Sequence, residues 1–490
     1  MIYKQIKNGI LFIVSILLIS ACGVGKVPDK TVIIADNANK QATPQTNTSL
    51  AEVNAERGYH RAKEAVLWSQ PIMGVAMTLD AIQNLGGDYN DIAYLSQPSN
   101  WKWRILTPNS VSLYVTSIVK TSPNEPMVID LPAVTKSTDI FGTIMDSFQV
   151  PLTDVGSMGA DAGKGGKYLV LSAAHNGDIP EGYIPVPTVR NLSYLMFRVI
   201  PSSFGEDDLK DANDLIQKIA IYPLDAPRQR GTHIDVYDKV FNTVDPRDAN
   251  YFDVLTGILN QETIVDRDLI MMGMMKTLGY QHGKAYEPAE PVRAMLSEAV
   301  KSALDDLIIM TRDIAGPWWK GNPAWMQPIK PVGPMTKFRY VTESAYATDP
   351  RGETYSMYCC APAKLGAATA YIYTARDVDG NPIEASLNYT LHIPADVPVK
   401  QFWSLTAYDA LTAVFFENVA RTDISSLNES LQFNKDGSID LYVGPVAPDG
   451  KASNWIETNS KNNAIFLFRF YGPEGGVKDG SWTMKGFKKI

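Results

Sequence analysis

The chain has 490 residues, of which 45% are hydrophobic and 20% are charged, and its formal net charge at pH 7 is −8. This composition is typical of a folded globular protein with a large core, and the length predicts two to three domains. Lys and Arg form no basic stripe longer than the short cluster at residues 485–489. Nucleic acid is therefore not expected to be a partner.

The first 22 residues have the pattern of an export signal. Lys4 and Lys7 precede the apolar segment GILFIVSILLIS, which is shorter than the about 20 residues that a membrane-spanning helix needs. Residues 19–21 (ISA) then precede Cys22, and this order resembles the signal of bacterial lipoproteins. The resemblance implies cleavage after residue 21 and acylation of Cys22. An ordinary signal peptide or a retained membrane anchor is the alternative.

We therefore expect residues 1–21 to be a lipoprotein signal peptide and residues 22–49, rich in Asn, Thr, Lys and Ala, to be a flexible tether. The expected partner of Cys22 is a lipid membrane, because several acyl chains anchor a protein firmly. The protein would then be lipid-anchored in the cell envelope, outside the cytoplasm. Gly23 in place of Asp after the cysteine favours the outer membrane if the host is Gram-negative.

Helices and strands are predicted to alternate in the first half of the folded part. Apolar residues at three- and four-residue steps predict a helix in residues 50–86, which Pro71 should break or kink before a second helix at 73–85. Residues 100–200 predict strands, most clearly where apolar residues alternate in 110–120. The glycine-rich segment 159–166 lacks the residue order of a phosphate-binding loop and is interpreted as a turn.

A helical middle precedes a second run of strands. Residues 206–224 open with acidic residues and predict a helix, and helical spacing recurs in residues 250–261, 266–279 and 291–316. The methionines at 271, 272, 274 and 275 are interpreted as core residues. Residues 316–334, rich in Pro, Gly and Trp, predict a non-helical crossing segment whose tryptophans line a groove or seal a domain boundary. From residue 365 onward, short strands separated by Gly and Asp turns predict an antiparallel sandwich or jelly roll.

Several of these segments resemble one bacterial family. The C-terminal segments FWSLTAYD (402–409), NKDGSIDLYVGPVAPDGKASNWI (434–456) and FRFYGPE, and the N-terminal segments RILTPNSVSLYV and GKYLVLSAAHNGDIPEGYIPVPT, are similar to the family named after the paired domains of unknown function 1254 and 1214. The resemblance covers about residues 60–490. It implies a β-rich protein of two modules with a jelly-roll-like C-terminal domain, and it brings no established reaction.

The resulting fold class is α+β, mainly antiparallel β. We expect a DUF1254-like module at residues 50–235, a helical insertion and crossing segment at 236–334, and a DUF1214-like β-sandwich at 335–490. One departure concerns function, because this chain has Val111 and Ser112 where the family often has Asp-Thr before Leu-Tyr. If the family acts through that aspartate, this member has altered or lost activity.

Reactive groups are hard to choose from the sequence. There is no G-x-S-x-G elbow, and none of the histidines stands beside a nucleophile motif, although a triad can still form in space. His175 with Asp178 and His233 with Asp235 offer at most two metal ligands each and are interpreted as turn-forming pairs, so we predict no metal ion and no cofactor. The adjacent Cys359 and Cys360 are interpreted as packed thiols, with a redox pair as the alternative.

The strand FWSLTAYD carries the clearest candidates. Phe402, Ser404, Thr406 and Tyr408 should share one face, which is either solvated or the wall of a cavity, while the more apolar opposite face packs inward and Asp409 caps a turn. Arg469 lies inside an apolar run, so it needs a carboxylate or a ligand anion if it is buried.

Two functions remain open at this stage. The first is an envelope hydrolase or lyase that acts on a sugar- or amide-containing substrate, a small molecule or carbohydrate, in a pocket between the modules. The polar walls of that pocket would be Arg104, Asn109, Tyr114, Tyr408 and Arg469. The second is a non-catalytic binding or scaffolding lipoprotein.

Overall fold

The computed structural model describes residues 49–312, 316–328, 338–363 and 369–490. The predicted signal peptide, nearly all of the predicted tether and the lipidation site Cys22 lie outside these residues. Within them the fold is α+β with mostly antiparallel sheets, as the sequence predicts.

The N-terminal module is a sandwich of two sheets. A six-stranded sheet has the order β11-β1-β3-β9-β5-β6, and a four-stranded sheet has the order β10-β4-β7-β8. The elements are β1 (Ile92–Tyr94), β3 (Leu113–Lys120), β4 (Met127–Leu131), β5 (Thr138–Asp146), β6 (Pro151–Gly156), β7 (Gly166–Ser172), β8 (Tyr183–Thr188), β9 (Leu192–Pro201), α2 (Glu206–Ile216), β10 (Ala220–Pro223) and β11 (His233–Asp235). The glycine-rich segment 159–166 forms turns between β6 and β7, as expected.

Alternation along β9 divides the two faces of the six-stranded sheet. Leu195, Phe197 and Val199 pack in the core that β4, β7 and α2 share. Tyr194 and Met196 point the other way, into a core formed with helices. Successive strand residues point to opposite faces, so both faces of this strand are covered and its sequence is apolar throughout.

A layer of helices forms that second core. It contains α1 (Leu50–Asn84), α3 (Asn250–Leu259), α4 (Leu269–Thr277) after the short helix η1 (Asp266–Asp268), α5 (Glu290–Arg312) and α6 (Thr348–Met357). Met275 is buried there and Met271 and Met272 pack against the same core, as the sequence analysis expected. The short strands β2 (Trp103–Arg104) and β12 (Phe241–Asn242) pair beside this layer.

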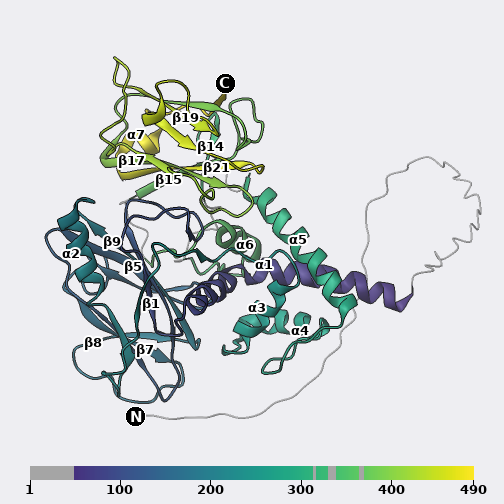
Figure 1. Ribbon diagram of the computed structural model, residues 1–490. Coiled ribbons are helices and arrows are strands. Elements are labelled where there is room, and N and C mark those ends of the chain that lie inside the picture. Colours follow the sequence, from purple (N-terminus) through teal and green to yellow (C-terminus); the bar gives the residue numbers. More distant parts are fainter. Residues whose placement is uncertain (1–48, 313–315, 329–337, 364–368) are drawn as a thin grey trace, which may run out of the picture. The chain divides into compact units, whose positions relative to one another are not determined.

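Helix α1, purple in Figure 1, continues through Pro71, so the predicted break into two helices is wrong. A proline inside a helix removes a backbone hydrogen bond and usually costs about 3 kcal/mol. Here side chains from other elements bond to the backbone around it: Gln149 Nε2 donates to the carbonyl of Pro71 at 2.8 Å, and Arg351 Nη2 donates to that of Trp68 at 2.8 Å. Tertiary contacts therefore hold a helix that local sequence alone would interrupt.

By length and composition, α1 is also the one helix among the described residues that could cross a membrane. Its most apolar window is 83% buried inside the fold. A core helix meets the same criteria, so this feature is weak support for a membrane span.

The C-terminal module is a second two-sheet sandwich. Its sheets have the orders β13-β14-β15-β21-β17-β18 and β20-β19-β16-β22, and they enclose a core rich in aromatic rings. The elements are β13 (Pro317–Trp319), β14 (Asn322–Met326), β15 (Thr369–Thr374), β16 (Tyr389–Ile393), β17 (Val399–Asp409), β18 (Asp423–Ser425), β19 (Ile439–Gly444), η2 (Ala452–Asn454), β20 (Trp455–Glu457), β21 (Ala464–Pro473), α7 (Gly475–Asp479) and β22 (Lys488–Lys489).

The described part of the predicted crossing segment belongs to this sandwich. Strands β13 and β14 form an antiparallel pair that extends the sheet through β15. Trp319 and Trp325 are buried in the sandwich core, where their indole N–H groups donate to the carbonyls of Val477 and Lys485. These tryptophans therefore neither line a groove nor seal a boundary. Their strands join the edge of the sheet, so both side chains pack in the core of the C-terminal sandwich.

Candidate functional site between the sandwiches and the helices

The outer face of the larger C-terminal sheet lies against the N-terminal module. On β17, Trp403, Leu405 and Ala407 point into the sandwich core, as predicted. Ser404, Thr406 and Tyr408 point outward and are nonetheless buried, so this face is not solvated. Asp409 accepts hydrogen bonds from the backbone N–H of Leu411 and from the side chains of Ser460 and Asn462, which confirms its role in a turn.

Four of the five predicted site residues meet here, around the loop at residues 107–110. Arg469 donates to Thr406 Oγ1 at 2.8 Å, to the Thr107 carbonyl at 2.9 Å and to the Tyr408 hydroxyl at 2.6 Å. That hydroxyl in turn donates to the Pro108 carbonyl at 2.5 Å. The structure therefore brings Arg469 and Tyr408 of the C-terminal module onto a loop of the N-terminal module.

Asn109 and Tyr114 complete this contact. The Tyr114 hydroxyl accepts from the backbone N–H of Asn109 at 3.0 Å, and the Asn109 side chain accepts from Ser112 Oγ at 3.0 Å. Burial raises the pKa of Tyr114. Ser112 thus supports a turn.

Arg104 lies apart from this group. Its guanidinium is paired with Glu417 and donates to Asn242 Oδ1 at 2.9 Å. It ties β2 to the C-terminal module, and among the described residues no hydrogen bond joins it to the group around Arg469.

The neighbours of Arg469 only partly match the prediction of a carboxylate or ligand anion. Its hydrogen bonds within the described ranges all go to neutral oxygens, and it forms no ion pair with Asp or Glu there. The guanidinium charge is thus buried with hydrogen-bond acceptors but without a paired carboxylate.

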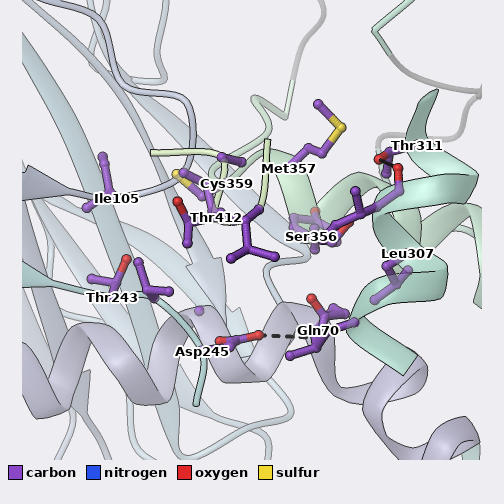
Figure 2. A pocket seen from close by; sticks show the side chains of 18 of the residues that line it. Gln70, Ile105, Thr243, Asp245, Leu307, Thr311, Ser356, Met357, Cys359 and Thr412 are labelled. Atoms are coloured by element: carbon purple, nitrogen blue, oxygen red, sulfur yellow. Dashed lines mark hydrogen bonds between the residues drawn. The ribbon is translucent and has the colours of Figure 1, made fainter. Parts of the chain in front are cut away.

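A separate pocket opens where both modules meet the helical layer, and we call it the junction pocket (Figure 2). Its volume is about 80 Å³, several times the roughly 10–15 Å³ that one water needs. Its walls come from α1, residues 105–106 after β2, β9, the 243–247 loop, α5, α6, β15, the 410–413 loop and β21. Most lining residues are apolar, among them Ile105, Leu304, Leu307, Met357 and Ile465.

Asp245 is the distinctive polar group of the junction pocket. Burial raises its pKa to about 7, against the opposing effects of a hydrogen bond from Gln70 and the charge of Arg247. The Gln70 amide lies 3.4 Å from Asp245 Oδ2, as Figure 2 shows, and also donates to the Tyr251 hydroxyl at 3.1 Å. A carboxyl that titrates near pH 7 can both donate and accept a proton under ordinary conditions.

Local structure explains how Asp245 reaches this position. It follows β12, whose pairing with β2 directs the chain along the pocket, and Pro246 comes directly after it. Gln70 precedes Pro71 on α1, and its neighbour Ser69 donates or accepts a 2.7 Å hydrogen bond with Tyr251. The contact between Gln70 and Asp245 therefore depends on the packing of α1 against α3, where Tyr251 holds Ser69 and Gln70.

Cys359 also lines the junction pocket, on the far side from Asp245 and Gln70 in Figure 2. Both Cys359 and Cys360 are free thiols. The hydrogen bond with Cys360 lowers the pKa of Cys359, with a smaller contribution from the charge of Arg198, while burial raises the pKa of Cys360. The Cys359 thiol is therefore the more reactive of the pair.

The predicted site residues do not form the walls of this pocket. None of Arg104, Asn109, Tyr114, Tyr408 and Arg469 lines it. Asp245 is one of 53 acidic residues, and no spacing marks it, because its proton affinity comes from burial by segments far away in the chain. Cys359 was visible as half of a rare adjacent pair.

The histidine pairs considered from the sequence show no metal-site geometry. His175 contacts the Pro123 carbonyl at 3.4 Å and His233 the Ile216 carbonyl at 3.1 Å. Among the residues described, no group of three or more His, Cys, Asp or Glu side chains could hold a metal ion. The junction pocket is lined by no histidine either.

Taken together, the fold defines an α+β protein of two β-sandwiches and a helical layer, with a small pocket where the three meet. The model of the protein family of unknown function DUF1254 matches residues 89–223, and that of DUF1214 matches residues 368–475. The chain therefore belongs to the proteins that pair a DUF1254 with a DUF1214 domain. No curated protein matches the chain.

Among solved structures, one shows a similar fold. The VPA0106 protein from Vibrio parahaemolyticus is 17% identical, with a TM-score of 0.52 over 88% of this chain and 100% of its own. An uncharacterised protein from Burkholderia cenocepacia is 11% identical, with a TM-score of 0.40 over 89% of this chain and 96% of its own. At such identity the first likeness speaks for the fold alone.

Proposed function

We propose that this protein is an exported, lipid-anchored enzyme that performs acid–base chemistry on a small, largely apolar molecule held in the junction pocket. The observation that carries the proposal is Asp245, a pocket carboxyl whose pKa burial raises to about 7. Perturbed carboxyls in concave sites are typical of catalytic acids and bases. The lining residues favour a ligand with apolar surface over a carbohydrate.

Between the two reaction types expected from the sequence, the pocket favours a lyase over a hydrolase. Hydrolysis through a covalent intermediate needs a nucleophile beside a base, usually histidine, and no histidine lines the pocket. An elimination needs a group that removes a proton next to a leaving group, and Asp245 suits that role. Gln70 would orient the carboxyl, since its amide reaches Oδ2.

The alternative function is a non-catalytic binding or scaffolding lipoprotein. It was favoured by Val111, which replaces an aspartate common in the family. Residue 111 does not line the junction pocket, so this replacement leaves the pocket chemistry unchanged. The pocket thus supports the enzyme more than the scaffold.

Attachment to the membrane is a separate part of the proposal. The support is the order of the first 22 residues, with two lysines, a short apolar segment and a cysteine at the cleavage point. An extracytoplasmic enzyme would meet small envelope molecules, and the predicted tether would give it reach.

The function can be tested without knowing the substrate. The full-length protein and its Asp245→Asn variant are incubated with a low-molecular-mass extract of the envelope fraction, and compounds consumed or formed are followed by mass spectrometry. We expect at least one compound to be converted by the wild type and not by the variant. Asp238→Asn, which removes an exposed carboxylate outside the pocket, should convert it normally.

Labelled water separates the reaction types. A hydrolase incorporates ¹⁸O from H₂¹⁸O into its product, and an eliminating lyase does not. If no compound is converted but one is retained by the wild type and not by Asp245→Asn, the binding alternative replaces the enzyme. If Asp245→Asn behaves as wild type throughout, the proposal fails.

A further inference from the structure

Two buried strands, one in each sandwich, carry an arginine with an aromatic neighbour. On β9, Arg198 lies in register with Tyr114 of β3 and Phe141 of β5. On β21, Arg469 lies in register with Ser404 of β17 and Tyr371 of β15. Both arginines lie on the strand faces that point toward the contact between the modules. Arg198 shares its face of β9 with Tyr194 and Met196, and Arg469 shares its face of β21 with Leu467.

The two guanidinium groups share their neighbours. Arg469 lies 5.4 Å from the centre of the Tyr371 ring, and Arg198 lies 5.9 Å from that of Tyr114. Tyr371 and Tyr471 are close enough to both arginines to interact with them electrostatically. We call Arg198, Arg469, Tyr371, Tyr471, Tyr358 and Ser404 the arginine–tyrosine cluster.

The cluster holds two positive charges and no paired carboxylate. Neither arginine forms an ion pair with Asp or Glu in the part of the chain that the structure describes. Asp423 is near enough to be affected by Arg469, but it accepts from Ser110 Oγ at 2.6 Å and burial raises its pKa. A buried guanidinium without an anionic partner is costly even when neutral oxygens accept its hydrogen bonds, so these two charges favour a bound counter-ion.

Unused hydrogen-bond groups lie beside these charges. The buried hydroxyl oxygens of Tyr358, Tyr471 and Ser404 have no hydrogen-bond partner among the described residues. Burial opposes ionisation of Tyr371, yet the charges of Arg198 and Arg469 outweigh it and lower its pKa. Arg198, Tyr358, Tyr371 and Tyr471 also keep some accessible surface. The cluster is thus polar and positively charged, and it carries hydroxyl groups with free hydrogen-bonding capacity.

From this arrangement we infer that the arginine–tyrosine cluster binds the carboxylate of a small organic acid, in a site distinct from the junction pocket. An arginine fork matches the two oxygens of a carboxylate, and the free tyrosine and serine hydroxyls can donate to the same group. Tyrosine rings line the cluster, which suits an organic body better than a strongly hydrated inorganic anion. The inference does not rest on the acid–base chemistry proposed for Asp245.

Isothermal titration of the full-length protein at pH 7 tests this site with acetate, benzoate and inorganic phosphate as probes. We expect at least one of the two carboxylates to bind, with benzoate at least as tight as acetate, and phosphate to be weaker than both. Benzyl alcohol, which keeps the ring but lacks the charge, should not bind. Absence of binding by both carboxylates, or tighter binding of phosphate, would overturn the inference.

Variants locate the site. Arg198→Gln should weaken carboxylate binding about 10-fold or more, because a charge-assisted hydrogen bond is lost, and Tyr371→Phe should weaken it by less. Arg198→Lys keeps the positive charge and serves as the test if Arg198→Gln fails to fold. It too should bind the carboxylate more weakly, because lysine lacks the planar guanidinium that donates two parallel hydrogen bonds. Arg104→Gln and Asp245→Asn should bind as wild type does.

Two outcomes oppose the assignment. Unchanged affinity in folded Arg198→Lys and Tyr371→Phe would show that the carboxylate binds elsewhere. Loss of binding in Asp245→Asn alone would place the acid in the junction pocket. Conversely, if Asp245→Asn has no effect on the conversion of any compound but carboxylates still bind to the wild type, the proposed acid–base function fails and the carboxylate site is supported.

Discussion

The side-chain amide of Gln70 on α1 lies 3.4 Å from Oδ2 of Asp245, 175 residues further along the chain. This contact joins the longest helix to the loop after β12 at the wall of the junction pocket. Because the same amide also donates to Tyr251, its oxygen and nitrogen are fixed in orientation. Asp245 is therefore held in place by Gln70, and burial raises its pKa to about 7.

Stability should depend on pH through Asp245. Its pKa rises from 3.8 to about 7 on folding, so between about pH 4 and pH 7 the folded state holds a proton that the unfolded chain has released. The free energy of unfolding should therefore fall as pH rises through this range and level off above it. Asp245→Asn should match wild type near pH 4 and exceed it by about 1–3 kcal/mol at pH 8.

Urea unfolding at pH 4, 6 and 8 measures this difference. Glu262, whose pKa burial also raises to about 7, contributes a slope of the same sign, so the variant should remove only part of the pH dependence. If the free energy of unfolding of Asp245→Asn changes with pH in parallel with that of the wild type over the whole range, Asp245 ionises normally.

The two arginines predicted as site residues should differ in their contribution to stability. Arg469 is 3% exposed and donates to the Tyr408 and Thr406 hydroxyls and to a backbone carbonyl of the other module. Arg469→Gln leaves those buried acceptors without donors and should cost about 2–4 kcal/mol. Arg104→Gln, whose partner Glu417 is 57% exposed, should cost less than about 1 kcal/mol. Denaturant midpoints compare them directly, and equal losses would contradict the assigned roles.

A buried ion pair fastens the N-terminal sandwich to the helical layer. Arg190, next to β9, pairs with Asp268 of η1, and neither side chain is more than 1% exposed. Asp268→Asn leaves the guanidinium charge buried without its partner and should cost about 3–5 kcal/mol. Asp266→Asn is the matched control at an exposed position of the same turn and should change stability by less than about 0.5 kcal/mol. A small effect of Asp268→Asn in calorimetry would mean that the helices are fastened by other contacts.

The proposed anchor has its own test. Cys22→Ala should release the protein from membranes, because the acyl chains would have no attachment point. The mature wild-type N-terminus should begin at an acylated Cys22 in mass spectrometry. Sedimentation of Cys22→Ala with membranes after a high-salt wash would contradict the lipid anchor.

The sequence was most informative where local pattern and tertiary environment agree. Alternation in β17 predicted the inward face correctly, since Trp403 and Leu405 enter the sandwich core. The opposite face, expected to be solvated or a cavity wall, is buried against the N-terminal module instead. Pro71 misled, because the side chains of Gln149 and Arg351 that bond to this part of α1 lie far away in the chain. Trp319 and Trp325 were placed at a boundary because their pairing with β15 could not be seen locally.

The same reasoning explains what was found and missed in the sites. Arg469 stood out as a charge inside an apolar run, and Arg198 in YLMFRVI has the same pattern but was not considered. Asp245 could not be predicted, because what distinguishes it is the burial that α1, α5 and the C-terminal module create together.

The most direct test of the central claim is a crystal structure of the protein purified from its host without added ligand, compared with Asp245→Asn prepared in the same way. The account predicts non-protein density in the wild-type junction pocket, in contact with Asp245, that is weakened or absent in the variant. A pocket closed by side chains, or the same ordered water in both proteins, would contradict it.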